Sequence, residues 1–211
     1  DPSSRTLVVT AADGSSTKVI APLGLNDGLV DVNWSPDGGI VGFSSTDSGG
    51  SVFGQNEVYL IGADGEAAGV LIVNGSNFKN IWSPDGANLL YSIADAGDDY
   101  RPSLWYGDAE GDRNGDIRLR LSLKTTVDKC TFASDTLAYC AVPLVLPAGS
   151  GSIPSNITSP DNLYSISFPT GRSTLVAIPA ANTKMFNLSV SADGHELYFT
   201  DAAGRLNLIQ L

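Results

Sequence analysis

The chain has 211 residues, of which 42% are hydrophobic and 17% are charged. The low share of charged residues and the 23 glycines favour a turn-rich, all-β protein with a real core. The net charge of −11 would repel a phosphate backbone and argues against nucleic-acid binding. No segment approaches the ~20 consecutive apolar residues of a transmembrane helix, so we expect no membrane span.

The first residues, Asp-Pro-Ser-Ser, show no feature of a signal peptide. We expect a mature or trimmed start. An export signal or membrane anchor upstream stays open as an alternative.

The first predicted elements are short strands separated by glycine turns. Residues 6–20 predict two strands around an Ala-Asp-Gly turn. Further on, alternation places Val30, Val32 and Trp34 on one face of a strand. Strands are then expected at residues 40–43, 58–61 and 70–73.

A pentapeptide recurs in the chain and divides it into repeats. Trp34-Ser35-Pro36-Asp37-Gly38 returns unchanged as Trp82-Ser83-Pro84-Asp85-Gly86, with weaker echoes at 132–135 and 190–194. Ser-Pro-Asp-Gly suits a type I turn, because Pro presets φ at the second position and Gly suits the fourth. We interpret the motif as structural: a hairpin turn preceded by a tryptophan that packs in the core.

The later segments follow the same plan of four strands. Strands are expected at 78–82, 89–93, 103–106, 117–123, 127–132, 136–141, 162–168, 173–178, 185–190, 196–200 and 205–211. Four-stranded units that recur about every 50 residues are typical of β-propeller blades. The predicted fold is an all-β propeller of four-stranded antiparallel blades.

We treat residues 1–211 as one propeller domain with four to five visible blades. The blade-like units cover about 1–22, 29–74, 77–124, 126–179 and 184–211. The last unit has three strands, and Lys18-Val19-Ile20 is the expected donor of a fourth. One strand is then left over, so the alternatives are a compact ring with an irregular seam and the C-terminal part of a larger propeller.

The two cysteines, Cys130 and Cys140, flank the third hairpin. A three-residue turn centred on Asp135 would pair Ala133 with Leu137 and place Cys130 opposite Cys140. Directly opposed strand residues have Cα atoms ~4.5–5.5 Å apart, within the span of a disulfide. We predict a disulfide, with two buried free thiols as the alternative. A disulfide implies an oxidising, extracytoplasmic compartment.

The repeats resemble a known family. An apolar lead into Trp-Ser-Pro-Asp-Gly, a strand, a polar loop and then Val-Tyr-Leu-Ile-Gly-Ala-Asp-Gly at 58–65 are similar to the WD40-like PD40 repeat. That repeat occurs in the propeller of the periplasmic protein TolB and in the propellers of prolyl-oligopeptidase-like enzymes. The segments 128–132 and 139–143 also resemble extracytoplasmic propellers of uncultivated bacteria with small genomes. The resemblance implies a propeller outside the cytoplasm and says little about activity.

One candidate metal site lies in the predicted turn of the second repeat. Asp108, Glu110, Asp112, Asn114 and Asp116 place oxygen side chains at alternate positions, which can wrap Ca²⁺. The spacing is similar to the calcium loop of integrin-type propellers, although an arginine replaces one of its glycines. The alternative is an extended acidic hairpin turn, because the first repeat has a plain Ala-Asp-Gly turn at this place.

A second candidate site is the loop that contains Asp95, Asp98, Asp99, Tyr100 and Arg101. Clustered carboxylates can do acid/base work, as propeller glycosidases do near the axis. Aspartates in loops are more commonly solvated turn formers, and we expect a binding loop here.

The sequence offers little for nucleophilic or zinc catalysis. Its one histidine, His195, follows a predicted turn, and there is no Gly-x-Ser-x-Gly motif. The cysteines are assigned to the disulfide, which leaves too few ligands for a zinc site. We predict no catalytic residue.

The sequence therefore favours a non-catalytic propeller scaffold at the bacterial cell envelope. Its partner would be a protein or an envelope component, bound through loops that differ between blades. We expect these loops at Thr46–Gly54, Asp95–Arg101 and Pro143–Pro160. The alternative is an enzyme-associated propeller, either glycosidase-like or the accessory propeller of a prolyl-oligopeptidase-like peptidase.

Overall fold

The computed structural model describes residues 4–45, 55–109, 115, 118–179 and 183–211. Antiparallel strands form five sheets among these residues, and within each sheet the strands pair in chain order. The sheets consist of β1 (Thr6–Thr10) and β2 (Thr17–Pro22); β3 (Val30–Val32), β4 (Ile40–Ser45), β5 (Asn56–Gly62) and β6 (Ala67–Val73); β7 (Ser76–Trp82), β8 (Asn88–Ala94), β9 (Pro102–Asp108) and β10 (Arg118–Arg120); β11 (Cys130–Ser134), β12 (Leu137–Pro143), β13 (Asp161–Ser167) and β14 (Arg172–Ala177); and β15 (Phe186–Val190), β16 (Glu196–Thr200) and β17 (Leu206–Gln210).

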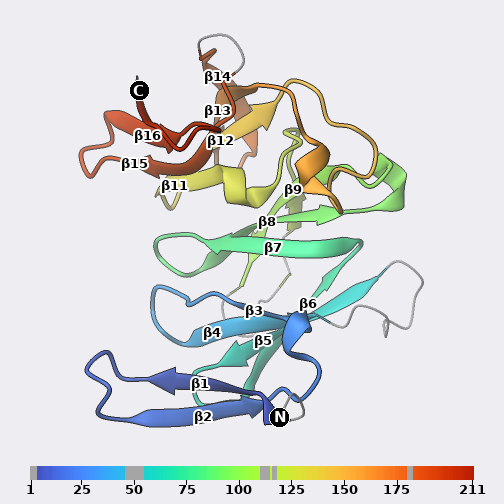
Figure 1. Ribbon diagram of the computed structural model, residues 1–211, viewed down its shortest axis with the longest axis vertical. Helices are drawn as coiled ribbons and strands as arrows, with labels where there is room; N and C mark the ends of the chain where they lie inside the picture. Colours follow the sequence, from blue (N-terminus) through green and yellow to red (C-terminus); the bar gives the residue numbers. More distant parts are fainter. Residues whose placement is uncertain (1–3, 46–54, 110–114, 116–117, 180–182) are drawn as a thin grey trace.

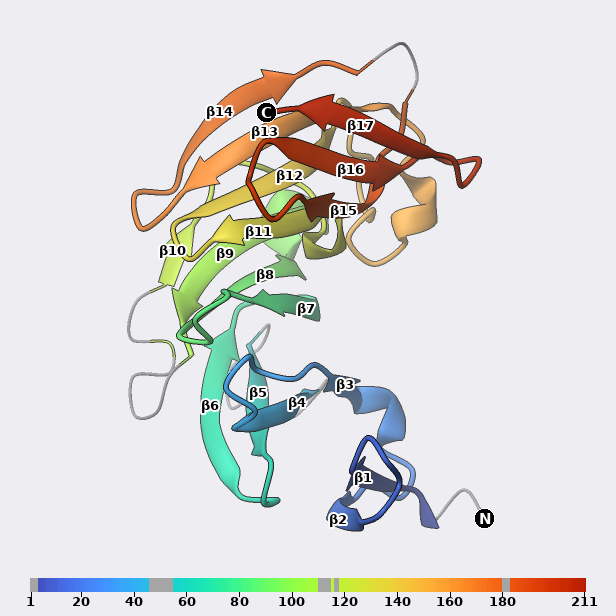
Figure 2. The same cartoon turned by 90° about the vertical axis from the view of Figure 1, so that its left-hand side faces the viewer.

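The sheets lie side by side along an open arc (Figures 1 and 2). The β1–β2 hairpin lies at one end of the arc, and the three-stranded sheet β15–β17 lies at the other. Between them stand three four-stranded sheets, which we call the first (β3–β6), second (β7–β10) and third (β11–β14) blades. This arrangement confirms the predicted all-β propeller architecture.

The expected closure of the last sheet by Lys18-Val19-Ile20 is wrong. In the described chain β2 pairs with β1, at the opposite end of the arc from β17. The reason is burial: Ile20 of β2 and Leu7 of β1 pack with Val41 of the first blade and leave water there.

Each hairpin turn of the Ser-x-Asp type is closed by the same set of hydrogen bonds. In the second blade the Ser83 hydroxyl donates to Asp85 Oδ1 at 2.5 Å and accepts from the Asn88 amide at 3.0 Å. The Asp85 carboxylate also accepts from the Ala87 amide at 3.0 Å. Ser35 with Asp37 and Ser191 with Asp193 repeat this arrangement. We call the side of the arc that carries these turns the turn end.

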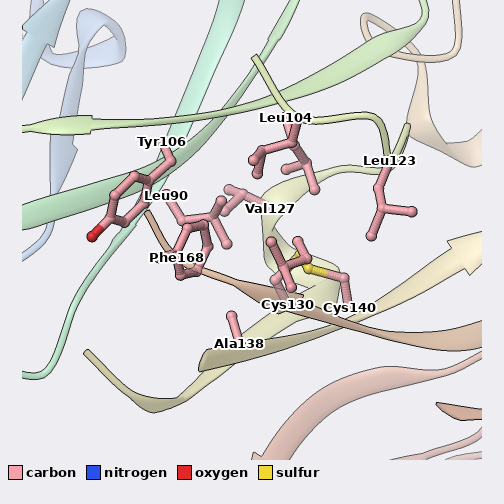
Figure 3. Close-up of a cluster of buried hydrophobic side chains, with 11 residues drawn as sticks. Leu90, Leu104, Tyr106, Leu123, Val127, Cys130, Ala138, Cys140 and Phe168 are labelled. Atoms are coloured by element: carbon pink, nitrogen blue, oxygen red, sulfur yellow. A yellow bond between two sulfur atoms is a disulfide. The ribbon is translucent and has the colours of Figure 1, made fainter. Parts of the chain in front are cut away.

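Apolar side chains fill the spaces between neighbouring sheets. Between the second and third blades, Tyr106 stacks on Phe168 with ring centroids 4.0 Å apart (Figure 3). Burial, together with a smaller effect of the nearby Asp85 carboxylate, raises the pKa of the Tyr106 phenol to about 12. Between the first and second blades, Trp82 packs on Phe43 at 5.6 Å. Blade-on-blade burial therefore holds the arc together.

The disulfide between Cys130 and Cys140 is present in this core (Figure 3). The two residues are direct partners on β11 and β12, with Cα atoms 4.1 Å apart. The expected pairing of Ala133 with Leu137 is wrong, because Ser134 pairs with Leu137 and Ala133 is bulged. The turn has two residues instead of three, and the bulge absorbs the extra residue without changing the cysteine register.

The prediction that both tryptophans of the repeated motif are core residues is half wrong. Trp82 is 8% exposed, whereas Trp34 is 50% exposed. Trp82 packs with Phe43 of the first blade, whereas Trp34 belongs neither to that cluster nor to the cluster that joins the first blade to the β1–β2 hairpin. Strand β3 also ends at Val32, two residues before Trp34.

Candidate functional site

The side of the arc opposite the turn end carries the long connections, and we call it the loop end. Two of the predicted binding loops, 95–101 and 143–160, lie there and are fastened to each other. The Gly149 amide donates to the Asp99 carbonyl at 2.8 Å, and the Gly151 amide donates to the Tyr100 carbonyl at 2.9 Å. These bonds join the second blade to the third through loops that are about 50 residues apart in the sequence.

Gly151 packs closely against Ala94 and the Tyr100 carbonyl, which fixes how the two loops dock on each other. A Cβ atom at this position would lie 2.6 Å from the Ala94 Cβ and 2.9 Å from the Tyr100 carbonyl oxygen. Real Cβ atoms do not come this close to such groups, so a residue without a side chain is required. The 143–160 loop can therefore dock on the end of β8 only because residue 151 is a glycine.

Arg101 adds a third fastening between these loops. Its Nε donates to the Leu146 carbonyl at 2.8 Å, and its guanidinium pairs with Asp99 at 2.6 Å. Asp99 is in the left-handed region, which an aspartate tolerates better than most residues. The predicted Tyr100 is 49% exposed at the surface of the same loop.

The three aspartates of the 95–101 loop have separate structural partners. Asp95 caps a short 3-10 turn by accepting from the Asp98 amide at 3.2 Å. Asp98 accepts from Lys124 at 2.7 Å and also pairs with Arg120. The Lys124 hydrogen bond, helped by the charge of Arg120, lowers the pKa of Asp98 against the opposing effect of burial. Each of these carboxylates is therefore engaged in a helix cap or an ion pair, and no two of them form a free acid/base pair.

A buried ion pair anchors the end of the 143–160 loop. Lys129 Nζ lies 2.5 Å from Asp161 Oδ2, and the two side chains are 7% and 0% exposed. The same Asp161 oxygen accepts from the Met185 amide at 2.7 Å. Lys184 reaches back to the Ile157 carbonyl at 3.1 Å. The third blade, the loop and the last sheet are therefore joined at one point.

A pocket of about 400 Å³ lies at the loop end between the second and third blades. Its walls come from β7, the end of β8, the start of β9, the segment before β11 and the docked 143–160 loop. The lining residues are Asn77, Lys79, Ser92, Ile93, Pro102, Thr126, Asp128, Gly151, Ser152 and Pro154. The Asn77 side chain donates to Ser152 Oγ at 3.1 Å and to the Gly151 carbonyl at 3.3 Å, which closes one wall. The volume is in the range of small-molecule or side-chain pockets.

A smaller hollow of about 180 Å³ adjoins this pocket and shares Asn77 and Lys79 with it. It lies toward the first blade and is lined there by Asp31 and Ser45. Lys79 Nζ lies 3.3 Å from Asp31 Oδ1, so the pair stands at the junction of the two hollows.

Exposed apolar side chains also occur on the loop end. Tyr100, Leu144, Val145 and Ile153 are between 49% and 63% exposed and all belong to the two fastened loops. Leu144 is held by its amide, which donates to the Pro160 carbonyl at 2.9 Å. Apolar groups on a rigid, irregular surface are typical of protein contact sites.

Other predicted sites lie wholly or partly outside the described residues. Of the calcium candidate, Asp108 ends β9, while Glu110, Asp112, Asn114 and Asp116 fall outside. The loop Thr46–Gly54 falls outside as well. Within the described ranges no group of three or more His, Cys, Asp or Glu side chains is arranged to hold a metal ion.

The described chain shows no helix long and apolar enough to cross a membrane. His195 is exposed in the turn that follows Asp193, and its amide donates to that carboxylate at 3.1 Å. This placement is that of a turn residue.

Of the pocket residues, Asn77 and Asp128 were not predicted from the sequence, whereas Ser152 falls within the predicted binding loop Pro143–Pro160. They come from three separate segments, and the pocket forms only when the 143–160 loop docks. Asn77 adopts φ of 55°, a conformation that asparagine tolerates, but this angle is visible only in the structure.

No protein-family model matches the chain, and no curated protein sequence matches it. Solved structures do match. TolB from Acinetobacter baumannii is 15% identical over 99% of this chain and 50% of its own length, with a TM-score of 0.54. The tricorn protease is 11% identical over 98% of this chain and 23% of its own, with a TM-score of 0.58. A Swd1 β-propeller domain from Myceliophteria thermophila is 18% identical over 88% of this chain and 52% of its own, with a TM-score of 0.50.

These likenesses define the fold. The structure is a β-propeller arrangement, similar to that of TolB and of a WD40 propeller. The chain spans about half the length of the TolB structure and about a quarter of the tricorn protease.

Proposed function

We propose that this chain is a non-catalytic scaffold of the bacterial cell envelope that binds a protein partner through its loop end. The observation that carries the proposal is the fastening of the 95–101 and 143–160 loops into one rigid surface, with a pocket beneath it. A rigid surface lowers the entropy lost on binding. The carboxylates of this surface are engaged in caps and ion pairs, which supports a binding role over acid/base catalysis.

Two observations support the extracytoplasmic compartment. The Cys130–Cys140 disulfide suits an oxidising environment, and disulfides are rare in the cytosol. The repeats also resemble PD40 repeats of the periplasmic protein TolB, and the fold matches a TolB structure. We propose residues 1–211 as a single propeller domain of PD40-type blades.

Position-specific photo-crosslinking in the native host tests the proposal. A benzophenone amino acid would replace exposed Ser152 at the loop end and, as a matched control, exposed Ala192 at the turn end. We expect a discrete crosslinked protein from position 152 and none from position 192. Equal yields from both positions, or none from either, would refute binding through the loop end.

A second candidate function is the accessory propeller of a peptidase, favoured by the match to the tricorn protease. In that case the crosslinked species at position 152 would be a peptidase or its own catalytic domain. The mass of the crosslinked peptides separates this outcome from an envelope protein.

A further inference from the structure

The loop-end pocket combines an apolar floor with a small number of charges. Ile93 is 2% exposed, and together with Pro102 and Pro154 it supplies the apolar lining. The charged groups that line the pocket are Lys79 and Asp128. What the pocket can bind depends on which of these charges is already neutralised.

The two charges differ in this respect. Lys79 is paired with Asp31 across the junction with the smaller hollow, at 3.3 Å. Asp128 is exposed, and its carboxylate has no hydrogen bond or ion pair within the part of the chain that the structure describes. The unpaired charge of the pocket is therefore negative. Its sign agrees with the net charge of −11, which attracts cationic partners over longer range.

The shape of the pocket suits one long side chain better than a folded element. Lysine and arginine carry an aliphatic stem that packs on apolar surface and a charged end that seeks a carboxylate. The floor at Ile93, Pro102 and Pro154 matches the stem, and Asp128 matches the charged end. The adjoining hollow beside Asn77 leaves room for the main chain on one side of the bound residue.

We infer that the pocket binds a lysine or arginine side chain from an extended segment of a protein partner, with Asp128 as the counter-charge. This inference rests on the proposed binding function and names the chemistry that the loop end recognises. Extended segments recognised through side-chain pockets are a common mode of peptide binding.

NMR titration of the ¹⁵N-labelled full chain with N-acetyl-arginine amide tests the inference. N-acetyl-norleucine amide has a similar stem without charge, and N-acetyl-glutamate amide has the opposite charge. We expect the arginine probe to shift the amides of Ile93, Asp128 and Ser152 and to bind at least about tenfold more tightly than either other probe. Similar binding of all three probes, or shifts confined to other residues, would overturn the inference.

A matched pair of variants separates Asp128 from general electrostatics. Asp128→Asn should weaken the arginine probe about tenfold, because it removes the unpaired carboxylate. Asp13→Asn changes the net charge equally, but Asp13 is exposed in the turn between β1 and β2 and does not line the pocket. It should leave the affinity within about twofold. Equal losses in both variants, or none in Asp128→Asn, would overturn the inference.

The outcome is distinguishable from failure of the proposed function. Crosslinking from position 152 reports whether a partner docks on the loop end at all. If that crosslink forms while the probe result is negative, the loop end binds a partner and the assignment of a cationic side chain is wrong.

Discussion

The two ends of the blades are built by different rules. At the turn end, the side chains of Ser83 and Asp85 accept hydrogen bonds from backbone amides of their own turn. Ser191 and Asp193 do the same in the last sheet. At the loop end, hydrogen bonds and ion pairs join segments far apart in the sequence, such as Arg101 with Leu146. The Ser-x-Asp turns repeat one local set of hydrogen bonds, with an added bond from the Asp85 amide to Asp135 Oδ1 in the turn of the third blade at 2.8 Å. The bonds that join the two loops of the loop end follow no such repeated pattern.

This difference indicates where specificity can lie. A turn that closes on itself contributes stability wherever it occurs, so its residues can recur in each blade. A surface made from non-repeating loops can present one arrangement of side chains and one pocket. Variants of the turn end should therefore change stability alone, whereas variants of the loop end should change binding as well. The predictions below run from the largest expected effect to the smallest.

The largest effect should come from the buried ion pair at the loop end. Lys129→Met leaves the Asp161 carboxylate buried without its cation, which should lower the free energy of unfolding by about 3–5 kcal/mol. Urea denaturation measures this. The control is Lys79→Met, whose pair with Asp31 is partly exposed and should change stability by about 1 kcal/mol or less. Equal losses of stability in both variants would show that the buried Lys129–Asp161 pair contributes no more than the exposed Lys79–Asp31 pair.

The disulfide between β11 and β12 of the third blade should have the next largest effect on stability. Replacing both Cys130 and Cys140 with alanine should lower stability by about 2–3 kcal/mol, because the short covalent loop no longer restricts the unfolded chain. Thermal unfolding of the variant and of the reduced protein should agree. An unchanged unfolding curve after full reduction would contradict a stabilising role.

Gly151→Ala should loosen the loop end specifically. The new Cβ would clash with Ala94 and with the Tyr100 carbonyl, an overpacking cost of about 1–3 kcal/mol. Hydrogen exchange should accelerate at the Gly149 amide, which docks on the Asp99 carbonyl. Gly28→Ala is the control, because a Cβ there meets nothing within 4 Å. Unchanged exchange at Gly149 would mean that the loop does not depend on this contact.

Ser83→Ala should weaken the turn end by about 1 kcal/mol, because the Asn88 amide loses its acceptor and Ser83 is fully buried. Ser191→Ala, in the more exposed equivalent turn, should have a smaller effect. Chemical denaturation measures both. A larger loss in Ser191→Ala would contradict the burial argument.

The smallest effect is a pH dependence of the loop end. The pKa of Asp98 is lowered in the folded state, chiefly by the Lys124 hydrogen bond. Its contribution is therefore complete above the unfolded pKa of about 3.9 and is lost as the pH falls through the lower folded value. After correction for intrinsic rates, exchange at the Gly151 amide should rise below about pH 4. Asp98→Asn should abolish this dependence, and a dependence that persists in that variant would assign it to another group.

Features set by local chemistry could be predicted from the sequence, and features set by long-range packing could not. The Ser-Pro-Asp-Gly turns and the register of Cys130 with Cys140 follow from local chemistry, which the sequence displays directly. The exposure of Trp34 depends on what lies beside the first blade, and the pocket depends on docking of the 143–160 loop. Both are consequences of long-range packing that no local pattern reports.

The proposed binding role of the loop end is tested most directly by two variants of similar stability. Gly151→Ala alters the loop end and Ser83→Ala alters the turn end, each carrying the photo-crosslinking amino acid at exposed Val145 in the native host. We predict that Gly151→Ala loses most of the partner crosslink while Ser83→Ala retains it. Equal retention or equal loss in the two variants would contradict the assignment of binding to the loop end.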